Sequence, residues 1–265
     1  ASIVDTGDPV PMTWPEHVTG SSSTSVSRIR SAPEFNTLTV DLGGTFDVSA
    51  MVSEIRFIGN PTPFTVSVAS VVGRHIVYND SAFDGGSAAL DASDDQAIAT
   101  DKTPLLANQI ASEANVVSHP LGVTTVFVDI ADLRELTVDD ITVKLGNSQN
   151  SETWSTLTTD VQLSTRRGQG DQGSDRVTIA MPPSTGVGEW MQIVVAATPA
   201  NGLPGDDVFY VGSAPGMAVN SGNDFTVNGS DFAGARDHTT NFLNPAGIEN
   251  SYDFNRDGQV NGTDL

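Results

Sequence analysis

Short runs in which apolar and polar residues alternate recur along most of this 265-residue chain. Such alternation places the apolar side chains on one face of an extended strand. Gly, Pro, Asn and Asp separate the runs, so we expect a mainly β protein with an antiparallel β-sandwich. The predicted strands cover residues 25–30, 37–42, 52–58, 64–72, 74–78, 123–130, 141–146, 157–164, 176–181, 191–198 and 207–212.

The pattern changes along the chain and indicates three regions. Residues 1–72 are expected to form an N-terminal β region, either a separate or a partial sandwich, and residues 73–213 a β-sandwich domain. Within that domain, residues 79–102 read as a long loop rich in Asp. After residue 213 the strand pattern stops, and residues 214–265 are expected to form a small module with a short helix at 232–238.

The charge balance is strongly acidic, with a formal net charge of −21. A field of that sign repels nucleic acid and anionic lipid and attracts cations. Of the 33 acidic residues 25 are Asp, which is common in turns and is a frequent calcium ligand. A solvated, halotolerant acidic surface is the alternative interpretation, and it is compatible with calcium binding.

Several kinds of chemistry are disfavoured by residue content. The chain has no Cys, which rules out disulfides, thiolate zinc sites and cysteine nucleophiles. Its four His, at 17, 75, 119 and 238, show no zinc-binding or triad spacing. No apolar run reaches the roughly 18 to 20 residues of a transmembrane helix. We therefore expect neither an enzyme nor a transmembrane segment.

The residues from Asp253 to Asp264, DFNRDGQVNGTD, have the spacing of a calcium-binding loop. Oxygen-bearing side chains stand at alternate positions, and the sixth residue is a Gly, where the chain must turn sharply. This is the EF-hand loop pattern with Asp in place of Glu at the end, and all twelve positions fit it. The expected ligands are Asp253, Asn255, Asp257, the backbone carbonyl of Gln259, Asn261 and Asp264.

A degraded copy of this loop precedes it by 33 residues, since VNGSDF at 227–232 repeats as VNGTDL at 260–265. Gly222 offers no side-chain oxygen in that copy, and Phe225 replaces the turn Gly. The first copy therefore either binds calcium or only keeps the fold, and the sequence leaves both readings open. Its candidate ligands are Asn220, Asp224, Thr226, Asn228 and Asp231.

The two loops together resemble the dockerin type I module. In that family each half is a calcium loop followed by one helix, and the hallmark V-N-x-x-D stands here at 227–231 and 260–264. The resemblance implies the calcium ligands of the second loop, and a cohesin-like domain as partner. It also implies a second helix, which would begin where this chain ends at Leu265. The module is thus expected to be truncated, which leaves cohesin binding open.

A broader resemblance covers about residues 72–265. RHIVYNDSAFDGG, SDRVTIAM, GDDVFYVGSAPG and SYDFNRDGQVNGTDL are similar to the C-terminal part of large secreted, dockerin-bearing proteins of environmental bacteria. This resemblance implies architecture and a secreted location at the cell surface, and it implies no particular activity.

The Asp-rich segment 79–102 is a second candidate calcium site. Carboxylates packed together are unfavourable without a cation, so calcium could order this loop. The alternative is a solvated acidic loop, and the sequence favours neither. The candidate ligands are Asp80, Asp84, Asp91, Asp94, Asp95 and Asp101.

The leading hypothesis is a non-enzymatic, calcium-dependent structural or adhesive module of a secreted surface, matrix or filament protein. Its partners would be other protein modules or copies of itself at the cell surface. The first alternative is attachment to a cohesin-like scaffold through a dockerin. The second is a carbohydrate-binding protein, for which Trp14, Trp154 and Trp190 would supply a polysaccharide-stacking platform.

Overall fold

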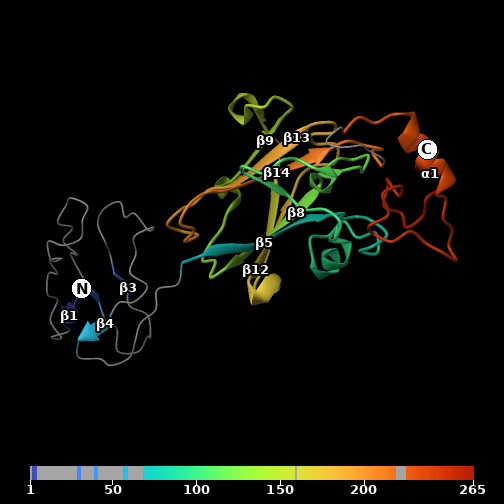
Figure 1. Ribbon diagram of the computed structural model, residues 1–265. Helices are drawn as coiled ribbons and strands as arrows, with labels where there is room; N and C mark the ends of the chain where they lie inside the picture. The colour runs from blue at the N-terminus through green and yellow to red at the C-terminus, as the bar shows by residue number, and fades with distance from the viewer. Residues whose placement is uncertain are drawn as a thin grey trace. The chain divides into compact units, whose positions relative to one another are not determined.

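The computed structural model describes residues 68–158, 160–218 and 225–265, with four short strands before them (Figure 1). By its contacts the chain divides into two compact units, Ala1–Ser67 and Val68–Leu265. The predicted strands at 25–30, 37–42 and 52–58, and Trp14, lie wholly or largely outside the described residues. The first unit contributes β1 (Ser2–Val4), β2 (Ile29–Arg30), β3 (Thr39–Val40) and β4 (Arg56–Ile58), with β1 pairing parallel to β4 and β2 antiparallel to β3.

The second unit is mainly β and confirms the predicted fold class, with ten strands in two antiparallel sheets. One sheet has the order β11-β12-β8-β5, and the other has the order β10-β9-β13-β14-β6, with β7 pairing parallel to β14. The strands are β5 (Ser70–Val77), β6 (Leu105–Leu106), β7 (Val116–Val117), β8 (Thr125–Ala131), β9 (Ile141–Gly146), β10 (Ser155–Thr156), β11 (Gln162–Arg166), β12 (Asp175–Ala180), β13 (Trp190–Val195) and β14 (Asp207–Ser213).

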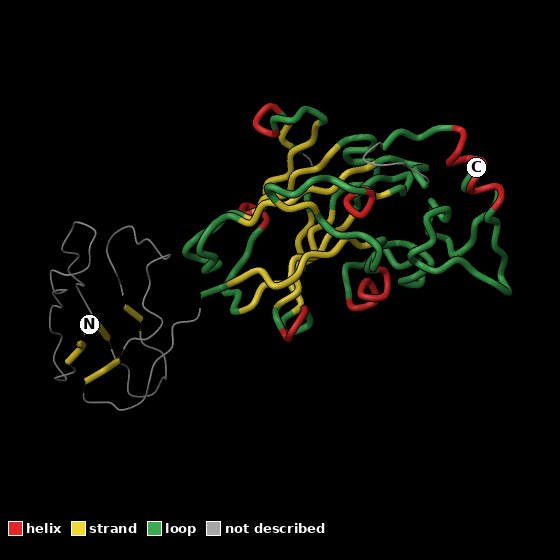
Figure 2. Tube along the Cα trace, viewed as in Figure 1, coloured by secondary structure: helices red, strands yellow, loops and turns green. Residues whose placement is uncertain are grey.

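Helical structure in the second unit is short and lies between strands or after them (Figure 2). Only α1 is an α-helix among the described residues, and none of their helices is long and apolar enough to cross a membrane. The helices are η2 (Ala92–Ala97), η3 (Glu113–Asn115), η4 (Val138–Asp140), η5 (Ser151–Thr153), η6 (Asp171–Gly173) and α1 (Gly229–Asp237).

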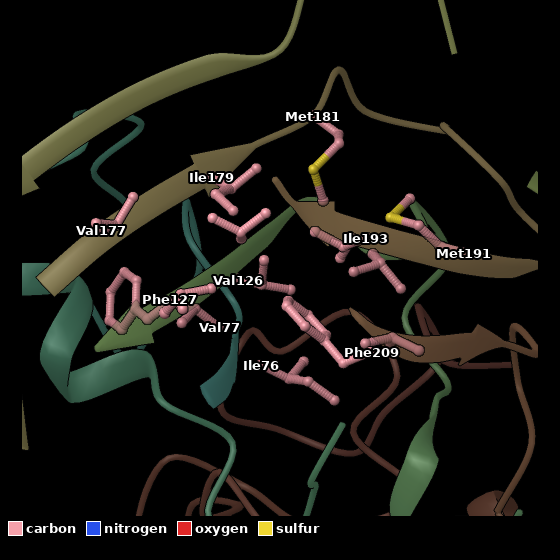
Figure 3. Packing of buried hydrophobic residues seen from close by; sticks show 14 of the residues in the cluster. Ile76, Val77, Val126, Phe127, Val177, Ile179, Met181, Met191, Ile193 and Phe209 are labelled. Carbon is pink, nitrogen blue, oxygen red and sulfur yellow. The ribbon is translucent and has the colours of Figure 1, made fainter. Parts of the chain in front are cut away.

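The main core lies between the two sheets (Figure 3). Alternate residues of β8 and β12, such as Val126 and Ile179, point toward it from the four-stranded sheet. Met191, Ile193 and Phe209 meet them from the six-stranded sheet, and all five side chains are at most 1% exposed. Period-two alternation in the sequence thus predicted the buried face, because successive strand residues point to opposite sides.

Three local expectations need correction. The strand predicted at 74–78 and the described end of the one predicted at 64–72 form a single strand, β5, whose register with β8 shifts between Val71 and Gly73. The strand predicted at 157–164 begins only at Gln162. The helix predicted at 232–238 begins earlier, at Gly229, because the side chain of Asn228 accepts a hydrogen bond from the Ser230 N–H and caps it.

β8 is buried on both faces, unlike a strand with one solvated side. The Asp-rich segment lies on its second face, since Arg176 donates both to Asp95 of that segment and to Asp129 of β8. After β14 the chain forms a second, smaller core of Ala235, Ala246, Phe254 and Val260. The expected module boundary at residues 213 and 214 stays a prediction.

Candidate metal centre

The loop 253–264 is organised around Asp253, whose side chain is fully buried. Its two carboxylate oxygens accept hydrogen bonds from the N–H groups of Asp257, at 3.2 Å, and Gly258, at 3.0 Å. Gly258 has φ +83°, which favours a residue without a Cβ. The carboxylate at the first position and the Gly at the sixth therefore build the sharp turn that the sequence predicts.

The end of the loop repeats the arrangement that begins α1. The Asn261 N–H donates to Asp264 Oδ2 at 2.9 Å, as the Asn228 N–H donates to Asp231 Oδ2 at 2.8 Å. In both copies the Asn side chain accepts from the N–H two residues later. In the first copy the V-N-x-x-D residues form the capping box of α1, and the second copy repeats these hydrogen bonds, a structural role that the sequence pattern alone did not assign.

The middle of the loop brings further oxygen-bearing side chains together. Asp257 Oδ1 accepts from the Gln259 N–H at 2.9 Å, and its Oδ2 accepts from the Asn255 side-chain amide at 3.1 Å. The loop thus offers three carboxylates, two side-chain amides and a peptide carbonyl, which is the all-oxygen set that calcium prefers. These residues fit the ion by donor type and number.

The electrostatics of the loop favour an added cation. Burial raises the pKa of Asp253 to about 6, and the charges of Asp264 and Asp257 act in the same direction, while Arg256 and the Gly258 N–H act against it. The described residues make no ion pair with these three carboxylates. A divalent ion would favour their charged forms at this point in the fold.

The first copy of the loop is only partly described, because Asn220 and Asp224 lie outside the described residues. Asn228 and Asp231 form the capping box of α1, and Asp231 Oδ1 also accepts from the Ala218 N–H at 2.7 Å. The Thr226 carbonyl accepts from the Asn228 side-chain amide at 3.4 Å. Calcium binding in this copy stays a prediction.

The acids of the segment 79–102 have separate partners in the described structure. Asp84 is buried and accepts hydrogen bonds from the N–H groups of Asp80, Ser81, Gly86 and Ser87, so it builds a turn. Asp91 and Asp94 form the capping box of η2. Asp101 lies 3.4 Å from Lys102. Asp84 thus stabilises a turn, Asp91 and Asp94 cap a helix, and Asp101 forms an ion pair.

Asp95 belongs to a buried charge network. The Arg176 guanidinium donates to Asp95 Oδ1 at 2.9 Å and to both oxygens of Asp129 at 2.8 and 2.6 Å. Arg166 also bonds Asp95, and both arginines lie over the ring of Phe127. Burial alone would raise the pKa of Asp129, but hydrogen bonds from Arg176 and His75 hold it well below its usual range.

Among the described residues, one group of three His or acidic side chains has ligand atoms within 4.8 Å of one another, namely His75, Asp129 and Asp171. His75 Nε2 lies 3.3 Å from Asp129 Oδ2 and 3.1 Å from Asp171 Oδ2. Sequence spacing could not find this group, because β5, β8 and η6 are brought together only by folding. Arg176 already supplies the positive charge that Asp129 requires, so we interpret the group as an ion-pair network.

The two described tryptophans have different surroundings on the six-stranded sheet. Trp190 is flanked in register by Gly146 and Gly212, and its ring contacts Phe225 edge to face at 6.0 Å between centroids. Trp154 lies over Gly146 and meets Tyr210 in the same way at 5.9 Å. Each indole packs against its own aromatic neighbour, and a shared polysaccharide platform stays a prediction.

The arrangement of described residues defines a β-sandwich-like unit that carries an oxygen-rich loop after its last strand. Comparisons with protein-family models, with curated proteins and with solved structures found no match to this chain. The dockerin resemblance therefore rests on the loop residues themselves.

Proposed function

We propose that this chain is a calcium-binding structural module of a secreted or cell-surface protein, with calcium held by the loop 253–264. The observation that carries the proposal is the fully buried Asp253, which accepts the N–H groups of Asp257 and Gly258 in a tight turn and has no ion-pair partner among the described residues. Asp257 and Asp264 would supply the other two carboxylates. Asn255, Asn261 and the Gln259 carbonyl would complete the coordination.

Bound calcium would act on stability rather than on a reaction. It would neutralise carboxylates that otherwise repel one another and would cross-link both ends of the loop. An ion that binds only the folded state adds roughly 2.7 kcal/mol to the free energy of unfolding when its concentration is a hundredfold above Kd. A rigid C-terminal segment suits a protein that holds other modules in place.

Calorimetry with calcium tests the proposal directly. The full chain should bind one calcium at this loop, and Asp257→Ala should weaken binding at least about tenfold, because it removes one charged ligand. Asp237→Ala is the matched control, since Asp237 is an exposed acid at the end of α1 and should leave binding unchanged. Equal binding by Asp257→Ala and the parent chain would refute the site.

The affinity bears on the proposed location. Extracellular calcium modules bind with Kd values of about 10⁻⁴ to 10⁻³ M, because calcium is abundant there. The absence of Cys also suits a chain whose loops are fixed by a metal instead of disulfides. We expect a dissociation constant in this range, and a nanomolar value would contradict an extracellular structural role.

A second candidate function is docking to another protein through the C-terminal segment. Of the nine large hydrophobic side chains exposed in the described part of the chain, five lie within residues 225–265. Phe242 and Leu243 are both 81% exposed, on a turn closed by hydrogen bonds between Asn241 and Asn244. Such a patch is typical of interaction sites.

Binding to a panel of cohesin domains, with calcium and with EDTA, tests this second function. The double variant Phe242→Ser/Leu243→Ser should lose any such binding and retain calcium. Val187→Ser is the control, because Val187 is exposed in the sandwich, between β12 and β13. Binding that survives the double variant would place the interface elsewhere.

A further inference from the structure

The calcium loop is attached to the sandwich by one unusual side chain, Arg256. Arg256 is the fourth loop residue, has φ +56° and is fully buried. Its guanidinium carbon lies 4.4 Å from the centre of the Tyr78 ring, and its Nη2 donates to the Tyr78 hydroxyl at 3.1 Å. Tyr78 directly follows β5 and is itself only 4% exposed.

One backbone hydrogen bond reinforces this attachment, since the Ala82 N–H donates to the Arg256 carbonyl at 3.0 Å. Within the C-terminal segment, Arg256 Nη1 also donates to the Asn250 carbonyl at 2.5 Å. The centroid of the His119 ring lies 6.1 Å from that of the Tyr78 ring. In Figure 1 the C-terminal segment accordingly lies beside the loop that follows β5.

We propose that Arg256 is a positioning residue that couples calcium binding in the loop to the stability of the sandwich at Tyr78–Ala82. The inference rests on the proposed function of the loop. Asp253, Asn255 and Asp257 flank Arg256 at alternate positions, so an ion held by them fixes the backbone on both sides of it. The Arg256 side chain is then held toward the sandwich, away from the ion.

Coupling of this kind works in both directions. Calcium favours the docked loop, and a docked Arg256 preorganises the ligands for calcium. Without calcium, repulsion among the loop carboxylates opposes docking, and the Ala82 N–H loses its partner more often. The segment that begins at Tyr78 would thereby respond to calcium bound in the loop 253–264, without holding an ion of its own.

Hydrogen exchange of the full-length chain, with calcium and with EDTA, tests the coupling. In the parent chain calcium should slow exchange at the Ala82 amide and in the loop. In Arg256→Met calcium should still slow exchange in the loop, but its effect at Ala82 should fall at least about tenfold, given the buried cation–π contact and charged hydrogen bond that are lost. Arg236→Met, an exposed arginine on α1, should behave like the parent.

Each outcome decides the question. If calorimetry shows no calcium binding by the parent chain, the proposed function fails and the coupling fails with it. If the parent binds calcium but Arg256→Met keeps full protection of Ala82, only the coupling is refuted. Should Arg256→Met not fold, Tyr78→Phe removes the hydroxyl acceptor alone. It should reduce the calcium effect at Ala82 by a smaller factor, and an unchanged effect in that variant refutes the coupling.

Discussion

Two acidic regions of this chain, residues 79–102 and residues 253–264, use Asp in different ways. In the first region Asp84 accepts four backbone hydrogen bonds, and Asp95 pairs with Arg166 and Arg176. In the second region Asp253 is buried with backbone N–H groups as its partners and no ion pair from a described residue. In the first region the protein itself supplies the partners of Asp84 and Asp95, whereas one oxygen of Asp94 is buried without a hydrogen-bond partner.

The difference shows that the number of acids does not identify a cation site. What matters is whether the fold already supplies each carboxylate with donors and positive charge, because an added ion stabilises only what is left uncompensated. Segment 79–102 covers one face of a sheet, where arginines lie beneath it. Loop 253–264 has one arginine, Arg256, which is directed at Tyr78.

The largest effect is expected from removing the arginine that compensates the first region. Arg176→Met leaves Asp129 buried without its charge partner, so the free energy of unfolding should fall by about 3–5 kcal/mol in a urea titration. The loss should be the same with calcium and with EDTA. Recovery of stability on adding calcium would instead show that His75, Asp129 and Asp171 can hold a metal ion.

Arg236→Met serves as the control for this charge removal. Arg236 is an exposed residue of α1 that pairs only with its neighbour Asp237, with both side chains 60% exposed. Exposed pairs contribute roughly 0–1 kcal/mol, so this variant should lie close to the parent chain.

A smaller effect is expected at Asp94, the least compensated acid of the first region. Burial raises its pKa to about 6, and Asp91 and Asp84 add to the rise. Between pH 6 and pH 4 the folded state therefore binds more protons than the unfolded state, and this group makes stability rise as the pH falls. Asp94→Asn should stabilise the chain by about 1–2 kcal/mol at pH 7 and lose that advantage near pH 4.

Asp91→Asn is the matched control in the same capping box. Asp91 is exposed, and hydrogen bonds from Ser93 lower its pKa. This variant should show no gain in stability at pH 7. A gain in both variants would mean that the net charge of the segment, and not the burial of Asp94, sets its stability.

The smallest change in the free energy of unfolding is expected from replacing one glycine in each region. Gly258→Ala and Gly86→Ala place a Cβ at φ +83° and +69°, where the new atom meets Ala82 at 3.7 Å in the first case and nothing within 4 Å in the second. Each should cost about 1 kcal/mol through backbone strain alone. Only Gly258→Ala should also weaken calcium binding, measured by calorimetry. An equal loss of calcium affinity in both variants would contradict the conclusion that only loop 253–264 binds the ion.

The mainly β class and the buried faces of the strands follow from the sequence, because alternation of residues is a local property of an extended chain. Strand 141–146 agrees with β9 residue for residue. The spacing of oxygen-bearing residues in 253–264 likewise predicted a sharp turn at Gly258. Local pattern failed where a strand continued through a register shift at Gly73.

Which acids have a positively charged partner depends on contacts between distant parts of the chain. Asp95 and Arg176 are 81 residues apart in the chain, and Arg256 and Tyr78 are 178 apart, so no local spacing could reveal either contact. The pairing of β8 with β5 and β12 sets Asp129 beside His75 and Arg176. The free energy of each carboxylate depends on its neighbours in space. An acid-rich segment can therefore resemble a cation site in the sequence when the arginines that pair with it belong to distant strands.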